Sequence, residues 1–145
     1  MQPFFYVRRD KRYEQINFSD IIYIKGKKGY IQIVTEQRTY LIMNTLTVVL
    51  NHLPPDQFTR IHHSYIVSLS RMKAFDRLWV WLHDMPEDTA FRPGLARVKE
   101  LPVGFKYRSK LRQSVSLMLN KSGSYHRKLE HVTMELEFEE KAMGF

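Results

Sequence analysis

The sequence contains no cysteine, few acidic residues and no long apolar run. Without cysteine it can form no disulfide framework, no thiolate nucleophile and no cysteine-based zinc site, which suits a reducing compartment. The longest apolar run, residues 78–82, is far shorter than the roughly 20 residues of a bilayer-spanning helix. The N-terminal residues also lack the apolar core of a signal peptide. We therefore expect a cytoplasmic protein without a membrane span.

What the chain does contain is a hydrophobic core and an excess of positive charge. Of its 145 residues, 43% are hydrophobic and 13% aromatic, enough for one buried core but not for two full-sized domains. Residues 1–121 carry 20 Lys and Arg against 10 Asp and Glu, whereas residues 122–145 carry 3 against 5. Such a basic body attracts polyanions over a Debye length of about 8 Å. Nucleic acid is therefore the leading candidate partner.

Short β-type segments separated by polar or glycine turns dominate the first 82 residues. The segments 4–8 and 12–18 predict a hairpin around Asp10 and Lys11. A basic turn bounded by glycines, residues 26–29, separates the next two segments, and Glu36-Gln37 connects the second of these to a third. The further segments that we expect to be extended are residues 21–25, 30–35, 38–43, 58–69, 73–75, 78–83 and 98–103.

Helical spacing of apolar residues appears in three places. Residues 46–53 predict a short helix that ends at Pro54, and the region after Gly104 predicts a second helix that ends near Gly123. Ser124 is a suitable cap for an amphipathic third helix, which either packs on the domain or mediates dimerisation. Residues 84–97 form an unusually long connection, expected at the surface. The apolar stripe of the second helix comprises Tyr107, Leu111, Val115, Met118 and Leu119.

Two tryptophans share one face of the segment 78–83. Leu78, Val80 and Leu82 alternate with Trp79 and Trp81 and therefore point to the opposite face. We expect both faces to be buried, because exposed paired tryptophans are costly. The alternative is that the tryptophan face meets a partner chain.

The sequence carries no motif of a known class of catalytic or cofactor site. It has no GxSxG, no phosphate-binding glycine loop of the Walker type, no HExxH and no EF-hand pattern. His62 and His63 are adjacent, and neighbours on a strand point to opposite faces, so they are poorly placed to share a metal ion. We expect a protein that is not an enzyme and that holds no metal or cofactor.

Three segments combine cations with aromatic or hydrogen-bonding side chains, a composition typical of nucleic-acid contacts. The first is the turn around residues 26–29, the second is residues 60–67 and the third begins at residue 106. Taken singly, each could be an ordinary solvated surface. Their charged members are Lys25, Lys27 and Lys28 in the first, Arg60, His62 and His63 in the second, and Lys106, Arg108, Lys110 and Arg112 in the third.

Together these segments resemble the LytTR-type DNA-binding domain of bacterial response regulators. The resemblance is carried by DIIYI at residues 20–24, KGYI at 28–31, FTRIHHSYIV at 58–67 and LPVGFKY at 101–107, and it extends from about residue 4 to about residue 111. It implies a mainly β fold of several small antiparallel sheets with short connecting helices, followed here by C-terminal helices. We accordingly divide the chain into a DNA-binding domain, residues 1–121, and a C-terminal amphipathic helix, residues 122–145.

The resemblance also implies a function and its residues. It implies sequence-specific binding of double-stranded DNA by a transcription regulator whose loops enter the major groove, with a homodimer on tandem half-sites. A receiver domain, or a histidine-kinase pathway, commonly acts upstream of such a module, so the chain is either a stand-alone regulator or part of a longer one. By position, the expected base contacts are Tyr30, His63 and Lys106, and the expected phosphate or supporting contacts are Lys25, Lys27, Lys28, Arg60, His62, Ser64, Arg108 and Lys110.

The sequence departs from the family pattern at several of these positions. His63 stands where many relatives carry Arg or Asn, Phe105 stands where a basic residue is common, and Ser68 replaces a frequent Asn. The preferred DNA sequence is therefore expected to differ from that of relatives. Two alternatives from other classes stay open, a β protein that binds single-stranded nucleic acid or RNA, and a protein-interaction module that uses the Trp79 and Trp81 face.

Overall fold

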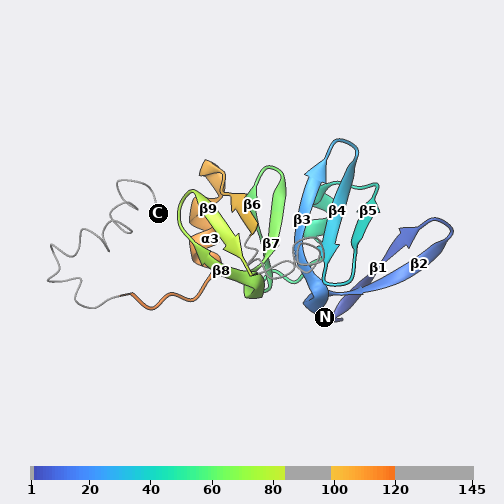
Figure 1. Cartoon of the computed structure of the whole chain (residues 1–145), viewed down its shortest axis with the longest axis horizontal. Coiled ribbons are helices and arrows are strands. Elements are labelled where there is room, and N and C mark those ends of the chain that lie inside the picture. Colours follow the sequence, from blue (N-terminus) through green and yellow to red (C-terminus); the bar gives the residue numbers. More distant parts are fainter. Residues whose placement is uncertain (1, 84–98, 120–145) are drawn as a thin grey trace, which may run out of the picture.

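The computed structural model describes residues 2–83 and 99–119 of the chain (Figure 1). The long connection expected at residues 84–97 and the helix expected from Ser124 lie outside the described residues. The predicted division into residues 1–121 and 122–145 therefore stays a prediction.

The described chain forms three antiparallel sheets joined by short helical turns. The sheets have the strand orders β1-β2, β5-β4-β3-β7-β6 and β10-β9-β8, so the predicted mainly β fold is confirmed. The strands are β1 (Phe4–Arg9), β2 (Arg12–Asn17), β3 (Ile21–Lys27), β4 (Tyr30–Thr35), β5 (Thr39–Ile42), β6 (Phe58–His62), β7 (Tyr65–Ser68), β8 (Met72–Phe75), β9 (Trp79–Leu82) and β10 (Lys99–Pro102). The helices are η1 (Phe18–Asp20), α1 (Leu46–Leu50), η2 (Leu69–Arg71), η3 (Phe105–Tyr107) and α3 (Arg108–Ser114).

β3 is the central strand of the five-stranded sheet, and both of its faces are buried. Its first four residues, Ile21, Ile22, Tyr23 and Ile24, are all buried, which explains why this stretch is apolar without alternation. Ile21 and Ile24 belong to a core shared with the N-terminal hairpin and α1. Ile22 and Tyr23 belong to a second core shared with the three-stranded sheet and α3. One strand thus joins the two halves of the domain.

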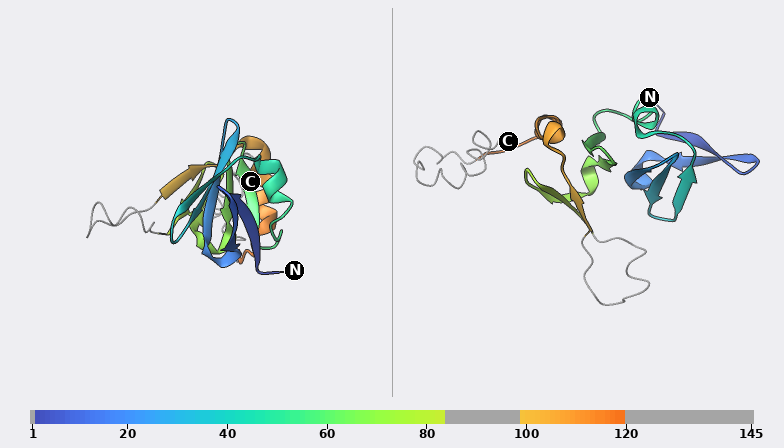
Figure 2. Two further views of the ribbon diagram at one scale, coloured as in Figure 1. Left: turned by 90° about the vertical axis from the view of Figure 1, so that its right-hand side faces the viewer. Right: turned by 90° about the horizontal axis from the view of Figure 1, so that it is seen from above.

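The hairpin β1–β2 covers one end of the first core and then extends beyond the sheet (Figure 2, right). Its strands pair from Phe4 opposite Asn17 to Arg9 opposite Arg12. The predicted two-residue turn at Asp10 and Lys11 is confirmed, and Asp10 adopts a positive φ of 56°, as a tight hairpin requires.

The segment 58–69, expected as one extended stretch, is instead a hairpin. β6 ends at His62 and β7 begins at Tyr65, so His63 and Ser64 form the turn between them. The register shifts between Arg60 and His62, which marks a bulge just before the turn. His63 therefore lies at an exposed turn rather than on a strand face, and the two histidines are not neighbours on one strand as expected.

The helix predicted from after Gly104 to near Gly123 ends earlier than its apolar stripe. α3 ends at Ser114, and Val115 already has extended dihedral angles. Leu111 is fully buried, whereas Met118 is 96% exposed. The prediction was wrong over residues 115–119, because Leu111 already reaches the core and the described residues provide no buried surface for Met118 and Leu119.

The tryptophan face of β9 is only partly buried, so the expectation that both faces are buried was wrong. Val80 and Leu82 are fully buried, but Trp79 is 39% exposed and Trp81 is only half-buried. The indole N–H of Trp81 donates to Glu100 at 2.8 Å, which satisfies the polar atom of this half-buried ring. The alternative that this face meets a partner chain stays a prediction.

None of the helices in residues 2–83 and 99–119 has the length and apolar character that crossing a membrane would require.

The close packing of β3 against α1 generates a stability prediction. A Cβ atom on Gly26 would lie 2.9 Å from both Cγ and Cδ1 of the buried Leu46. Because this overpacks the core, Gly26→Ala should lower the free energy of unfolding by about 1–3 kcal/mol in a denaturant titration.

Gly29, in the same hairpin, provides the matched control. Its φ is +86°, and a Cβ atom added there would have no neighbouring atom within 4 Å. Gly29→Asn, which introduces a residue that tolerates this conformation, should therefore cost less than about 1 kcal/mol. Equal losses for the two variants would contradict the packing explanation.

Candidate nucleic-acid interface

Three segments that are distant in the sequence meet at one edge of the molecule. The turns of the β3–β4 and β6–β7 hairpins lie at the upper edge in Figure 1. The backbone N–H of Gly26 donates to the carbonyl oxygen of Ser64 at 2.8 Å. The backbone N–H of Gly104 donates to the carbonyl oxygen of Ile61, also at 2.8 Å. The β6–β7 turn is thus fixed between the other two segments. We call residues 27–29, 60–64 and 104–108 together the basic edge.

The Arg60 side chain stabilises the β6–β7 turn through hydrogen bonds to its backbone. Its guanidinium donates to the carbonyl oxygens of His62 at 3.3 Å and His63 at 2.6 Å, and to the hydroxyl of Thr47 at 3.3 Å. Its Cζ also lies 5.8 Å from the centroid of the Tyr107 ring, a cation–π distance. The planar guanidinium therefore connects the turn to α1 and to η3, which a flexible lysine could not do in the same geometry.

His62 fixes the backbone of the same turn. Its Nδ1 accepts a hydrogen bond of 3.0 Å from the backbone N–H of Ser64, so this nitrogen must be unprotonated and any remaining proton is on Nε2. Burial lowers the pKa of His62 below its ordinary value of 6.5, and the neighbouring His63 and Arg60 lower it further. The neutral imidazole is thus the form that holds the turn.

The third segment places Lys106 and Phe105 beside this turn. Gly104 packs closely, because a Cβ there would lie 3.1 Å from Cδ2 of Tyr107 and 3.6 Å from Cα of His62. The N–H of Tyr107 donates to the carbonyl of Gly104 at 2.9 Å, and the Lys106 Nζ lies 5.7 Å from the centroid of the Tyr107 ring. The Tyr107 ring therefore lies within cation–π distance of two cations, Arg60 and Lys106.

A cavity of about 410 Å³ opens among these segments. It brings together five of the predicted contact residues, and it also includes the start of α1, which the sequence reasoning missed. Thr45 caps α1 by accepting from the N–H of Val48 at 3.2 Å, and a threonine directly before a helical apolar pattern is the signal that could have located it. The predicted residues at this cavity are Lys27, Lys28, Arg60, His63 and Ser64, and the missed residues are Asn44, Thr45 and Thr47.

The other predicted contact residues do not line this cavity. Tyr30 begins β4 opposite Lys27. Lys25 pairs with Tyr65, and its Nζ lies 5.8 Å from the centroid of that ring. Lys110 is exposed on α3. The remaining predicted residues, His62, Lys106 and Arg108, belong to the basic edge.

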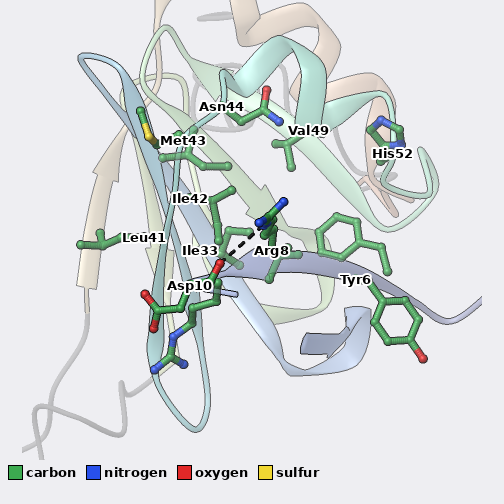
Figure 3. Close-up of a pocket in the computed structure, with 14 residues that line it drawn as sticks. Tyr6, Arg8, Asp10, Ile33, Leu41, Ile42, Met43, Asn44, Val49 and His52 are labelled. Atoms are coloured by element: carbon green, nitrogen blue, oxygen red, sulfur yellow. Dashed lines mark hydrogen bonds between the residues drawn. The ribbon is translucent and has the colours of Figure 1, made fainter. Parts of the chain in front are cut away.

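A second cavity lies between the N-terminal hairpin, β5 and α1 (Figure 3). It has a volume of about 630 Å³ and a mainly aliphatic wall that includes Ile33, Ile42 and Val49. Arg8 donates from its Nε to the carbonyl oxygen of Asp10 at 3.4 Å at this cavity. None of the predicted contact residues lines it, so it is separate from the basic edge.

Within the described ranges, no three His, Asp or Glu side chains gather as ligands for a metal ion. The chemical groups concentrated at the basic edge are hydrogen-bond donors and cations, which suit an anionic partner with exposed acceptor atoms.

A comparison with protein families relates most of the chain to one domain type. A family model described as the LytTr DNA-binding domain matches residues 11–116, a range that includes the whole basic edge.

Individual relatives match shorter segments. Sensory transduction protein LytT of Bacillus subtilis is 31% identical over 58 residues, which are 40% of this chain and 24% of that protein. LytT of Bacillus anthracis is 30% identical over 57 residues, which are 39% of this chain and 23% of that protein. The matched segment thus spans about a quarter of these relatives.

Among solved structures, the chain is similar to a LytTr DNA-binding domain from Bacillus cereus, described as that of a putative methyl-accepting/DNA response regulator. The TM-score is 0.61 at 21% sequence identity, with 81% of this chain and 100% of the other covered. At this level of identity the similarity establishes the shared fold.

The hydrogen bond to His62 generates a pH prediction. Because the pKa of His62 is lower in the folded chain than its ordinary value, the unfolded chain binds more protons as the pH falls. The stability that the neutral ring contributes is therefore complete above about pH 6.5 and is lost as the pH falls through the lowered pKa. We expect the free energy of unfolding to decrease between pH 7.5 and pH 5.

His62→Asn isolates this contribution, because its Oδ1 can accept from Ser64 and does not titrate. The variant should lose less stability than the unchanged protein over the same pH range in denaturant titrations. An identical loss in the two proteins would show that His62 is not the group responsible.

Proposed function

Because the chain belongs to the family of LytTr DNA-binding domains, we propose that it is a transcription regulator that binds double-stranded DNA sequence-specifically through the basic edge. The observation that carries this proposal is the convergence of three cationic segments, with the β6–β7 turn hydrogen-bonded to Gly26 and Gly104 on either side. Loops that are fixed relative to one another can meet a duplex without the cost of ordering them on binding.

The exposed cations of this edge and of the neighbouring helix α3 suit the phosphate backbone. Lys27 and Lys28 are exposed at the β3–β4 turn, and Lys110 is exposed on α3. Each cation that neutralises a phosphate releases counterions, so such contacts supply affinity and a salt dependence but no sequence information. We assign these three lysines, together with Lys25 and Arg108, to the backbone.

Three other side chains have donor and acceptor groups that suit base edges. His63 is exposed at the β6–β7 turn, Lys106 is exposed on η3 and Tyr30 is half-buried at the start of β4. A lysine can donate to O6 or N7 of guanine, and histidine or tyrosine can donate or accept at several bases. The major groove has the width and the unique pattern of acceptors that such loops need, so we place them there.

The side chains of Arg60 and His62 have a different role in this proposal. Both already hydrogen-bond within the β6–β7 turn, so they position His63 and Ser64 for the duplex rather than supply the main contacts. Any N–H donors of Arg60 that stay free can add a phosphate contact.

We also propose that two copies of the chain bind tandem half-sites as a homodimer on chromosomal DNA in the cytoplasm, downstream of a receiver domain or a histidine-kinase pathway. Half-sites one helical turn apart, about 10–10.5 base pairs, would present the same groove face to both copies.

The test of the proposal is selection from a randomised duplex library with the 145-residue protein. The selected duplex, a scrambled duplex and the single strand of the selected sequence are then compared across a salt series. A short repeated motif that binds at least about tenfold tighter than the scrambled duplex supports the proposal. Equal binding of all three, lost together as salt rises, would contradict it, since charge alone would then explain the affinity. Preference for the single strand would favour the single-strand alternative.

Substitutions at the basic edge should separate the two kinds of contact. Lys106→Ala and His63→Ala should each weaken binding to the selected duplex by about 1–3 kcal/mol, with little effect on the scrambled one. Lys27→Ala should weaken both duplexes alike and reduce the slope of log K against log salt by about 1. Fluorescence anisotropy at several salt concentrations measures both quantities.

Lys11→Ala serves as a matched control, because Lys11 is an exposed lysine at the turn of the β1–β2 hairpin, outside the basic edge. It should leave the preference for the selected duplex unchanged. If Lys106→Ala weakens both duplexes equally, the assignment of Lys106 to a base edge is wrong.

A further inference from the structure

Phe105 presents an apolar ring in the middle of the cationic surface. Its side chain is 77% exposed, which makes it the most exposed aromatic residue in the described part of the chain. It lies on η3 directly before Lys106, within the basic edge. Single exposed apolar residues are common on protein surfaces. The environment of this ring, however, is unusual in two respects.

The first respect is that the Phe105 ring has a specific partner. The guanidinium carbon of Arg108 lies 5.0 Å from the centroid of the Phe105 ring, the shortest cation–π distance among the described residues. The Nε of Arg108 is buried and has no hydrogen-bond partner within the described residues. The stacked guanidinium thus restricts the ring on one side while most of the ring stays open to solvent.

The second respect is the position of the ring relative to the hydrogen-bonding groups. The segment that carries it is fixed to β6 by the bond from Gly104 to Ile61, and Tyr107 packs beneath Arg60 and Lys106. A duplex that is contacted by Lys106 would therefore also meet the neighbouring apolar ring. DNA offers one exposed apolar group in the major groove, the C5-methyl group of thymine.

We propose that Phe105 is a specificity-determining residue that reads thymine through contact between its ring and the C5-methyl group. This inference rests on the proposed function, since it requires a bound duplex. It adds to the donors and acceptors at the basic edge a contact that recognises a base by an apolar group. No bond is made or broken, and the contact requires only that the methyl group leave water.

Replacement of thymine by uracil removes this methyl group and leaves the hydrogen-bonding pattern intact. In the duplex selected from the library, each dT is replaced in turn by dU, and the affinities of the unchanged protein and of Phe105→Ala are measured for every duplex. We expect one or two positions at which dU weakens binding of the unchanged protein about threefold to fivefold, the effect of one methyl-sized group. Phe105→Ala should bind the selected duplex without dU correspondingly less tightly than the unchanged protein does. Its affinity should not change when dU replaces dT at those positions.

Two further variants act as controls. Tyr13→Ala removes another exposed aromatic ring, which lies on β2 with Arg8 beside it, and it should keep the full sensitivity to dU. Phe105→Leu keeps an apolar side chain and should retain part of the sensitivity. Because Phe105 is exposed, its variants should unfold at the same denaturant concentration as the unchanged protein, which confirms that they are folded.

The outcomes separate this inference from the proposed function. If a preferred duplex is selected but dU affects the unchanged protein and Phe105→Ala equally at every position, thymine reading by Phe105 is wrong and sequence-specific binding stands. If no duplex is preferred over its scrambled counterpart, the proposed function fails and the inference fails with it.

Discussion

The geometry of the basic edge depends on the backbone hydrogen bonds that hold the β6–β7 turn on either side. Ser64 accepts from Gly26 of the central strand, and Ile61 accepts from Gly104 at the start of η3. Because these donors and acceptors belong to the main chain, they set the spacing of the three segments independently of the side chains that project from them. β3 gives this arrangement its rigidity, since it is buried on both faces and belongs to both cores.

The side chains in and beside the β6–β7 turn form two groups, one that stabilises the turn and one that is exposed for binding. Arg60 and His62 point their polar atoms at the backbone of the turn and determine its shape. His63 is exposed and is free to meet a partner. A motif of closely spaced polar residues thus combines support and recognition within a few positions. Loss of a supporting residue would therefore reduce recognition without removing any group that touches the partner.

Much of the fold followed from the sequence, because strands with alternating or continuous apolar residues and turns with glycine or aspartate have strong local signals. The hairpin at Asp10 and the apolar stretch from Ile21 are examples. The β6–β7 turn was missed, because its two residues, His63 and Ser64, are not the glycine, asparagine or aspartate that usually mark a two-residue hairpin turn. Its conformation depends instead on hydrogen bonds to Arg60 and His62. The resemblance to the family identified candidate contact residues, but their grouping with Thr47 required tertiary contacts between segments far apart in sequence.

The open space around the β3–β4 turn has an evolutionary consequence. A Cβ atom added to Gly29 would meet no atom within 4 Å, whereas Gly26, only three residues earlier, packs against Leu46. Residues that hold the fold and residues that face outward are thus adjacent in the sequence but separate in their packing. Exposed tip residues such as Lys27 and Lys28 can therefore change with little loss of stability. Under the proposed function, a lineage can then acquire new target sequences while selection on folding keeps the strands unchanged.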